Sequence, residues 1–457
     1  MKIAIMGFGV VGSGVYEVVK SLNNSRAKNV TEPVEVKRIL DLRDFSGLPY
    51  ADLFTDKFDD IISDGEIEAA AEVMGGITPA YDYTKRLLQS GRSVITSNKE
   101  LVAKHGTELL QIAHDNGVHY MFEASVGGGI PIIRPLINCL AANEITEVMG
   151  ILNGTTNYIL TRMIKDSQTF DEALKGAQEA GYAERDPSSD VEGKDTCRKL
   201  AILSSIAFGR FADSDKIAAE GITKITLADV AYAESIGRSV KLVGLSKKVG
   251  NGMFAAVCPM MLEGRHPLGG VEDVFNGILV RGSASGDVMF YGRGAGKLPT
   301  ASAVVADIID VTKHRDIGSA LLWTDAGDYM CVGAELDAVK FARYIRVAAD
   351  AGKRDGAMRR ILDIVPDCEF IRLSEPEYVN EFAVITRAMP RSGYARVRRK
   401  FARPTAWMRF WGKLCCIDVE RGVIRYERFT DEKKYTAKRI RLQPKRVLFY
   451  YNLCKKP

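Results

Sequence analysis

The sequence predicts an α/β chain of three parts: an N-terminal doubly wound parallel sheet, a central α+β domain and a C-terminal ferredoxin-like module. Strand and helix patterns alternate through residues 1–123, which is typical of a parallel sheet covered by helices. Helical and strand patterns mix between residues 135 and 282. After residue 316 the order is strand, helix, strand, strand, helix, which suits a ferredoxin-like fold. A stretch rich in Gly and Pro at 125–135 indicates the first boundary.

Each expected element rests on an apolar run bounded by turn residues. In the first part we expect strands at 2–6, 34–40, 69–74, 93–96 and 118–123, and helices at 12–22, 81–90 and 99–116. In the central part we expect strands at 144–152 and 241–247 and an apolar helix at 198–208. A helix at 298–312 begins near Pro299, since proline is favoured in a first turn. The last part has its expected elements at 343–347, 356–364, 369–373, 383–387 and 394–401.

The composition is that of an ordinary globular protein. Of the 457 residues, 46% are hydrophobic and 26% are charged. No apolar run reaches the roughly 18 residues needed to span a bilayer, so no membrane partner is expected. The eight cysteines form no CxxC pair and no signal peptide is evident, which predicts reduced thiols in a cytoplasmic protein. The five histidines lack the spacing of a zinc site.

The net charge of +5 conceals an acidic body and a basic tail. Residues 391–457 contain 20 Lys and Arg but only 5 Asp and Glu. Such a tail could bind nucleic acid or acidic lipid. A solvated surface is the interpretation we favour, so no nucleic-acid partner is expected.

A complete G-x-G-x-x-G motif follows the first strand and opens the first helix. In that context the first glycine makes a tight turn, the second lets the backbone approach a pyrophosphate and the third permits close helix packing. The helix then presents free N–H groups to the anion. The motif predicts a Rossmann-type dinucleotide site made by Gly7, Phe8, Gly9, Val10, Val11 and Gly12.

Two further segments lie at expected strand ends, where ligands bind in open α/β sheets. Asp41 favours NAD because an acid there binds a ribose 2′-hydroxyl, whereas Arg43 favours NADP because it accommodates a 2′-phosphate. The choice stays open, and Asp41 as a plain turn residue is an alternative. Lys99 could face a ligand carboxylate or phosphate, or it could be solvated beside Asn98 as a helix cap.

The densest polar stretch is residues 181–199, which ends as an apolar helix begins. Asp195 and Lys199 are four residues apart and share one helix face. From spacing alone, an exposed salt bridge worth a few tenths of a kcal/mol is the favoured reading. The pair also lies where the helix enters a core, which is where burial would tune a proton-transfer lysine.

Three loops could bind ligands, and each has a plain structural alternative. Residues 123–131 could turn carbonyl groups inward around a hard monovalent cation or form an interdomain hinge. Residues 153–157 offer hydroxyl and N–H groups or cap a helix. Residues 292–296 form a glycine loop that permits close approach to a planar ring.

Taken together and in order, these blocks resemble the homoserine dehydrogenases. The resemblance covers roughly residues 1–316 and rests on six segments: GFGVVGSGV, SNKELVAKHG, EASVGGGIPII, ILNGTTNYIL, GYAERDPSSDVEGKDTCRKLAIL and YGRGAGKLPTASAVVAD. It implies reversible, NAD- or NADP-dependent interconversion of L-homoserine and L-aspartate 4-semialdehyde. That reaction belongs to threonine, methionine and isoleucine biosynthesis, and the implied substrate is therefore a small molecule.

The resemblance also implies roles for individual residues. Lys199 would transfer the proton, Asp195 would assist it, and Lys99 would lie where cofactor and substrate meet. Glu184, Asp190, Thr155 and Tyr182 would bind substrate, and Gly294 would lie beside the nicotinamide. The implied ligands of a Na⁺ or K⁺ ion, mostly through backbone oxygens, are Glu123, Val126, Gly128 and Ile130.

The implied domains are a nucleotide-binding domain at 1–130, completed by a helix at about 298–316, and a substrate-binding and dimerisation domain at 131–297. A linker at 317–340, an ACT-like regulatory module at 341–403 and a basic extension at 404–457 of unknown structure would follow. The resemblance implies a threonine effector and a homodimer or homotetramer. The module departs from the family at residues 349–357, where an expected Asp-x-Pro-Gly-like turn lacks its proline, which puts effector binding in doubt.

Two other functions remain open from the residues alone. Another semialdehyde or amino-acid dehydrogenase could use the same nucleotide fold, but the array of Glu184, Asp195 and Lys199 argues against it. A cofactor-binding sensor would have no need of Lys99 and Lys199.

Overall fold

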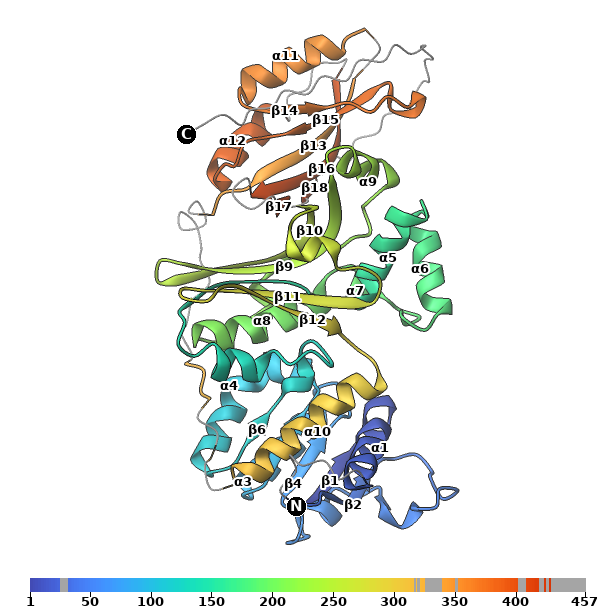
Figure 1. Ribbon diagram of the computed structural model, residues 1–457, viewed down its shortest axis with the longest axis vertical. Helices are drawn as coiled ribbons and strands as arrows, with labels where there is room; N and C mark the ends of the chain where they lie inside the picture. Colours follow the sequence, from blue (N-terminus) through green and yellow to red (C-terminus); the bar gives the residue numbers. More distant parts are fainter. Residues whose placement is uncertain are drawn as a thin grey trace.

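The computed structural model describes residues 1–24, 32–315, 318, 321–324, 339–349, 352–401, 408–418, 423–424 and 427–428. Most of the expected linker at 317–340 and most of the basic extension at 404–457 lie outside these residues. Three parts follow one another along the long axis, with the N-terminal sheet at one end and the C-terminal module at the other (Figure 1). No helix in the described ranges is long and apolar enough to cross a membrane.

The N-terminal part is a six-stranded parallel sheet in the order β3-β2-β1-β4-β5-β6. Its strands are β1 (Lys2–Met6), β2 (Glu35–Leu40), β3 (Phe54–Thr55), β4 (Ala69–Glu72), β5 (Ser93–Thr96) and β6 (Tyr120–Met121). Its helices are α1 (Val10–Asn24), α2 (Asp59–Ile62), α3 (Ala80–Gln89) and α4 (Lys99–Asp115). The expected doubly wound domain is confirmed, and most element ends agree within two residues.

Both faces of this sheet are buried, because successive side chains of a strand point to opposite sides. Ile3 and Ile5 of β1 belong to one apolar cluster, which includes Val15 of α1. Ala4 and Met6 belong to the other cluster, together with Leu109 of α4. The continuous apolar runs in the sequence therefore reflect burial on two sides.

One helix returns to this sheet from later in the chain. Helix α10 (Lys297–Lys313) follows the central part in sequence but packs against α1 (Figure 1). The two helices approach so closely that a Cβ atom at Gly14 would lie 3.0 Å from the Ala301 Cβ atom.

The central part is an antiparallel sheet in the order β12-β11-β7-β9-β10. These strands are β7 (Ile145–Ile151), β9 (Arg238–Val249), β10 (Gly252–Glu263), β11 (Phe275–Gly282) and β12 (Gly286–Arg293); the short β8 (Ala218–Ala219) pairs with β10. The helices are α5 (Gly154–Lys165), α6 (Phe170–Glu179), α7 (Ser188–Val191), α8 (Lys194–Phe208) and α9 (Leu227–Glu234). Helix α8 lies between the central sheet and α4 of the first part (Figure 1).

The C-terminal module has the strand order β16-β13-β15-β14, with all neighbours antiparallel. Its elements are β13 (Ala342–Ala349), α11 (Arg354–Ile364), β14 (Glu369–Ile371), β15 (Glu381–Ile385), α12 (Arg391–Phe401) and β16 (Met408–Asp418). The expected βαββα order is confirmed. Strand β16, which was not predicted, completes the ferredoxin-like sheet from within the expected extension at 404–457.

Two short strands connect and extend this sheet. Strand β17 (Val423–Ile424) pairs with both β10 and β16, so the central and C-terminal sheets are continuous, and β18 (Glu427–Arg428) also pairs with β16.

Candidate active site

The glycine-rich turn between β1 and α1 has the shape of a phosphate cradle. Gly7 has φ of +95°, and a Cβ atom there would lie 2.9 Å from the Met74 Cα atom. A Cβ atom at Gly12 would lie 1.9 Å from the Gly7 carbonyl oxygen, whereas nothing lies within 4 Å of one at Gly9. Helix α1 begins at Val10, so its free N–H groups face this open space. The turn therefore fits the pyrophosphate of a dinucleotide.

The neighbouring residues of the motif have different surroundings. The Phe8 ring is buried among Tyr16, Phe45 and Phe54, whereas Val10 is 67% exposed. Phe8 therefore offers only its backbone to the site, and its N–H group donates to the Asp41 carboxylate at 2.7 Å.

Asp41 and Arg43, which favour different cofactors, pair with each other. Arg43 donates to the Asp41 carboxylate from Nε at 2.9 Å and from Nη2 at 2.8 Å. This pairing holds the pKa of Asp41 well below its ordinary value. The Arg43 side chain is 61% exposed, so it covers the acid from the solvent side. Asp41 itself is 10% exposed, and its role in choosing between NAD and NADP stays a prediction.

Lys99 is fixed at the start of α4 by a buried polar network. The Asn98 side chain caps the helix by accepting from the Leu101 N–H group at 3.1 Å. The Thr96 hydroxyl accepts from the Asn98 N–H group at 2.9 Å and donates to Glu72 at 2.6 Å. A cation in a first turn opposes the helix dipole, so Lys99 is not there for helix stability. The expected Asn98 cap is confirmed, whereas Lys99 pairs with Asp195 of this chain, and its contact with a ligand stays a prediction.

Asp195 lies between two lysines from two parts of the chain. Its Oδ1 atom is 2.5 Å from Lys99 Nζ, and its Oδ2 atom is 2.8 Å from Lys199 Nζ. The Asp195 and Lys199 side chains are only 2% and 10% exposed. The expectation of an exposed salt bridge is wrong, because α8 packs with this face against the central sheet and α4.

The surroundings of Lys99 and Lys199 shift their pKa values in opposite directions. Burial lowers the pKa of Lys199; Asp195 opposes this shift, and nearby Lys99 adds to it. Burial also acts on Lys99, but there the pull of Asp195 prevails and raises its pKa. Burial disfavours the ionised form of Asp195, yet Lys199 and Lys99 hold its pKa below the ordinary value. Lys199 is therefore the easier of the two amines to deprotonate, which suits it to lose and regain a proton.

The segment between β7 and α5 supplies two groups, from Leu152 and Asn153, that were not among the predicted site residues. The Leu152 carbonyl accepts from Lys199 Nζ at 2.9 Å. The Asn153 amide donates to Asp195 at 2.9 Å and to Asp190 at 2.7 Å, which brings Asp190 into the cluster. The position of a backbone carbonyl group cannot be predicted from a sequence pattern. The sequence indicates Asn153 only as a helix cap, a role that it also has in the structure.

The other expected substrate residues lie at the edge of the cluster. The Thr155 hydroxyl donates to the Tyr182 carbonyl at 2.7 Å, which ties the loop after α6 to the start of α5. Tyr182 is 46% exposed. Glu184 is exposed on the same loop, and no polar contact in the described part of the chain joins its carboxylate to Lys199 or Asp195.

The loop expected to hold a cation is built around a buried acid. The Glu123 carboxylate accepts from the N–H groups of Ile132, Ile133 and Arg134 at 2.6 to 2.8 Å. Its side chain is thus already engaged, and a cation here would depend on carbonyl oxygens of residues such as Val126 and Gly128. No group of three or more His, Cys, Asp or Glu in the described ranges could hold a metal ion. The monovalent cation stays a prediction.

The glycine loop expected beside the nicotinamide lies against the loop of residues 123–131. A Cβ atom at Gly128 would lie 2.5 Å from the Gly294 carbonyl oxygen, and one at Gly294 would lie 2.0 Å from the Asn276 amide nitrogen. The Ile130 N–H group donates to the Gly127 carbonyl at 2.9 Å. A side chain at Gly128 or Gly294 would therefore clash with the neighbouring chain segment, so both positions require glycine.

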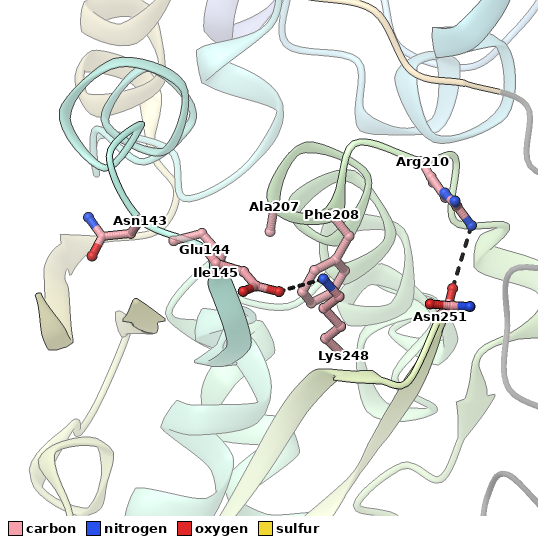
Figure 2. Close-up of a pocket in the computed structure, with 8 residues that line it drawn as sticks. All are labelled: Asn143, Glu144, Ile145, Ala207, Phe208, Arg210, Lys248 and Asn251. Atoms are coloured by element: carbon pink, nitrogen blue, oxygen red, sulfur yellow. Dashed lines mark hydrogen bonds and ion pairs between the residues drawn. The ribbon is translucent and has the colours of Figure 1, made fainter. Parts of the chain in front are cut away.

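A separate cavity of about 330 Å³ lies away from these residues. Figure 2 shows its lining, where Glu144 pairs with Lys248 at 2.5 Å and Arg210 reaches the Asn251 carbonyl at 3.5 Å. It contains none of the predicted site residues. Its other lining residues are Asn143, Ile145, Ala207 and Phe208.

Two family models match the first two parts of the chain. Residues 7–123 match the family model for the NAD-binding domain of homoserine dehydrogenase, and residues 131–309 match the model for homoserine dehydrogenase. The homoserine dehydrogenase of Bacillus subtilis (strain 168) is 40% identical over 322 residues, which are 70% of this chain and 74% of the relative. The chain belongs to the homoserine dehydrogenase family. The Synechocystis homoserine dehydrogenase is 41% identical over 319 residues, 68% of this chain and 73% of that one.

Solved homoserine dehydrogenases share the architecture. The crystal structure from Thiobacillus denitrificans has a TM-score of 0.78 and 33% identity, and the match covers 91% of this chain and 97% of that one. The likeness therefore extends beyond the two family models. A hyperthermophilic archaeal homoserine dehydrogenase mutant, solved in complex with NADPH, has a TM-score of 0.59 and 28% identity, with 68% and 97% covered. NAD(P) is the family cofactor that the glycine turn fits.

Proposed function

We propose that Lys99, Asp195 and Lys199 perform the proton transfer of an NAD(P)-dependent homoserine dehydrogenase. The observation that carries this proposal is the buried Asp195 carboxylate held between Lys99 at 2.5 Å and Lys199 at 2.8 Å. The arrangement joins the nucleotide-binding part to the central part. A reaction between a bound cofactor and a small substrate needs its proton-transfer group at such a junction.

The chemistry follows from the charges. When bound, the nicotinamide supplies or removes the hydride of the interconversion of L-aspartate 4-semialdehyde and L-homoserine. In the reducing direction the substrate oxygen gains negative charge, which a Lys199 ammonium stabilises and protonates. In the oxidising direction Lys199 must be neutral to accept that proton, and its lowered pKa favours this form. Asp195 keeps the two amines together, and Lys99 adds positive charge.

We assign the substrate-binding role to Asp190, Thr155, Tyr182 and Glu184. Asp190 is the best supported of these, because its carboxylate lies within the Asn153 network. Thr155 and Tyr182 are linked to each other beside it. Glu184 lies on the same loop, where its exposed carboxylate is accessible to a substrate amino group.

The cofactor-binding role belongs to the glycine turn, with Lys99 and Gly294 on the substrate side. We further propose that the protein forms a homodimer or homotetramer and that its C-terminal module binds a threonine effector. We also propose a cytoplasmic location. The ferredoxin-like topology supports the regulatory role. The departure from the family turn falls partly on residues 350–351, which lie outside the described residues.

The test is nicotinamide absorbance with L-homoserine, with NAD⁺ and NADP⁺ supplied in parallel. We expect turnover in the wild type, and a kcat at least about 100-fold lower in Lys199→Ala with cofactor binding retained. Lys194→Ala is the matched control, because Lys194 begins the same helix but is 61% exposed and pairs with Glu192. Wild-type kcat in Lys199→Ala would refute the assignment.

A further inference from the structure

We infer that Asn153 is a positioning residue that holds the Asp190 and Asp195 carboxylates together by donating one amide N–H group to each. The inference rests on the proposed roles of Asp195 and Lys199. Asn153 is 5% exposed, and its Nδ2 atom lies 2.7 Å from Asp190 Oδ1 and 2.9 Å from Asp195 Oδ2. Both protons of the amide are therefore directed at acids.

The orientation of this amide is fixed from its other side. Its Oδ1 atom accepts from the Thr156 N–H group at 2.9 Å and from the Thr156 hydroxyl at 3.0 Å. The backbone N–H group is an obligate donor, so the oxygen must face α5 and the nitrogen must face the acids. The opposite orientation would place a carbonyl oxygen against two carboxylates.

The Asn153 amide reduces the repulsion between the Asp190 and Asp195 carboxylates. Two carboxylates that share one neighbour repel each other. A neutral group with two donors hydrogen-bonds both of them without adding a positive charge that would disturb Lys199. The preceding residue acts on the other partner, because the Leu152 carbonyl accepts from Lys199 Nζ. One dipeptide thus orients both members of the Asp195–Lys199 pair.

The competing role is helix capping alone, since Asn153 is also the N-cap of α5. Asn153→Asp and Asn153→Ser separate the two roles. Asp and Ser are good N-caps, so both variants keep the acceptor for Thr156. Neither has the two amide donors. Asn153→Asp also adds a negative charge next to Asp195.

The experiment measures kcat, its pH profile, the cofactor Kd and Tm for both variants. Three charged groups face Lys199: Lys99 from α4, Asp190 from α7 and Asp195 from α8. A further carboxylate beside them favours the Lys199 ammonium, so Asn153→Asp should move the alkaline activation of homoserine oxidation upward by about one pH unit. Both variants should lose kcat by about tenfold or more and keep the wild-type cofactor Kd.

A matched control is Thr169→Ala, which removes the N-cap of α6 away from the cluster. It should lower Tm and leave the pH profile unchanged. Wild-type kcat and pH profile in both Asn153 variants would overturn the inference and leave capping as the only role. If one variant fails to fold, the other decides. Failure of the proposed function would appear separately, as normal turnover in Lys199→Ala.

Discussion

Two buried carboxylates occupy two interfaces of this molecule, and their partners differ in kind. Asp195 lies where α4 meets α8 and is held by Lys99 and Lys199. Asp229 lies where α9 meets the C-terminal module, is 0% exposed and is held by Arg346 Nη1 at 3.1 Å. Both acids are charged groups removed from water, which is costly unless they are paired.

Whether the buried acid pairs with a lysine or an arginine decides whether the pair can take part in proton transfer. A guanidinium stays protonated at any ordinary pH, so the Asp229–Arg346 pair can only hold the interface together. Arg346 also donates to the Thr226 hydroxyl at 2.9 Å, and the Asp229 carboxylate accepts from the Thr226 hydroxyl at 2.7 Å. An amine can lose its proton when burial lowers its pKa, as it does for Lys199. Lysine at a buried acid thus indicates function, whereas arginine there is compatible with a purely structural role.

The largest effect should come from Asp195→Asn, which keeps the shape and removes the charge. Lys99 and Lys199 would then lose the carboxylate that lies between them, and the pKa of Lys199 would fall further because Asp195 raises it. We expect kcat to fall by about 10³-fold with cofactor binding retained. Steady-state kinetics and a cofactor titration check this. Glu179→Gln is a suitable control, because its pair with Lys175 has the same spacing but is 69% and 78% exposed.

The matching change at the other interface should affect stability and not chemistry. Asp229→Ala removes the nearer carboxylate partner of the buried Arg346, which keeps only Glu381 at 3.6 Å, and should lower the free energy of unfolding by about 3 kcal/mol. Denaturant unfolding measures this, and the pH profile of the remaining activity should match the wild type. A shifted profile would mean that the two interfaces are not separate in function.

A smaller effect, on cofactor preference, is expected at the Asp41–Arg43 pair. Arg43→Ala frees the Asp41 carboxylate, which can then bind a ribose 2′-hydroxyl and repel a 2′-phosphate. The ratio of kcat/KM for NAD⁺ over NADP⁺ should rise by about tenfold, or about 1.4 kcal/mol. An unchanged ratio would show that the Asp41–Arg43 pair does not face the ribose.

The fold was largely predictable because the spacing of apolar residues distinguishes strands from helices in each part of the chain. The buried parallel strands, such as Lys2–Met6, appear as apolar runs. Strand Met408–Asp418 was missed because its partner, β13, lies about 60 residues earlier in the sequence and no local pattern announces the pairing. The unfamiliar composition of the surrounding basic segment hid it further.

The site was predictable in residue type and not in geometry. Spacing alone made Asp195 and Lys199 an ordinary surface pair, and only the packing of α8 shows that they are buried. The network that fixes them depends on Asn153 and on a main-chain carbonyl, more than 40 residues away in sequence. Hydrogen bonds over such separations are a property of the tertiary structure.

Whether Lys199 exchanges the proton can be read from the pH profile of homoserine oxidation. We would measure kcat for homoserine oxidation against pH in the wild type and in Lys199→Arg, which keeps the positive charge but cannot deprotonate. We expect an activating ionisation below the ordinary lysine pKa of 10.5 in the wild type, and its loss from the residual rate of the variant. If both proteins show the same ionisation, Lys199 is not the proton-transfer group, because the proton then passes through another group.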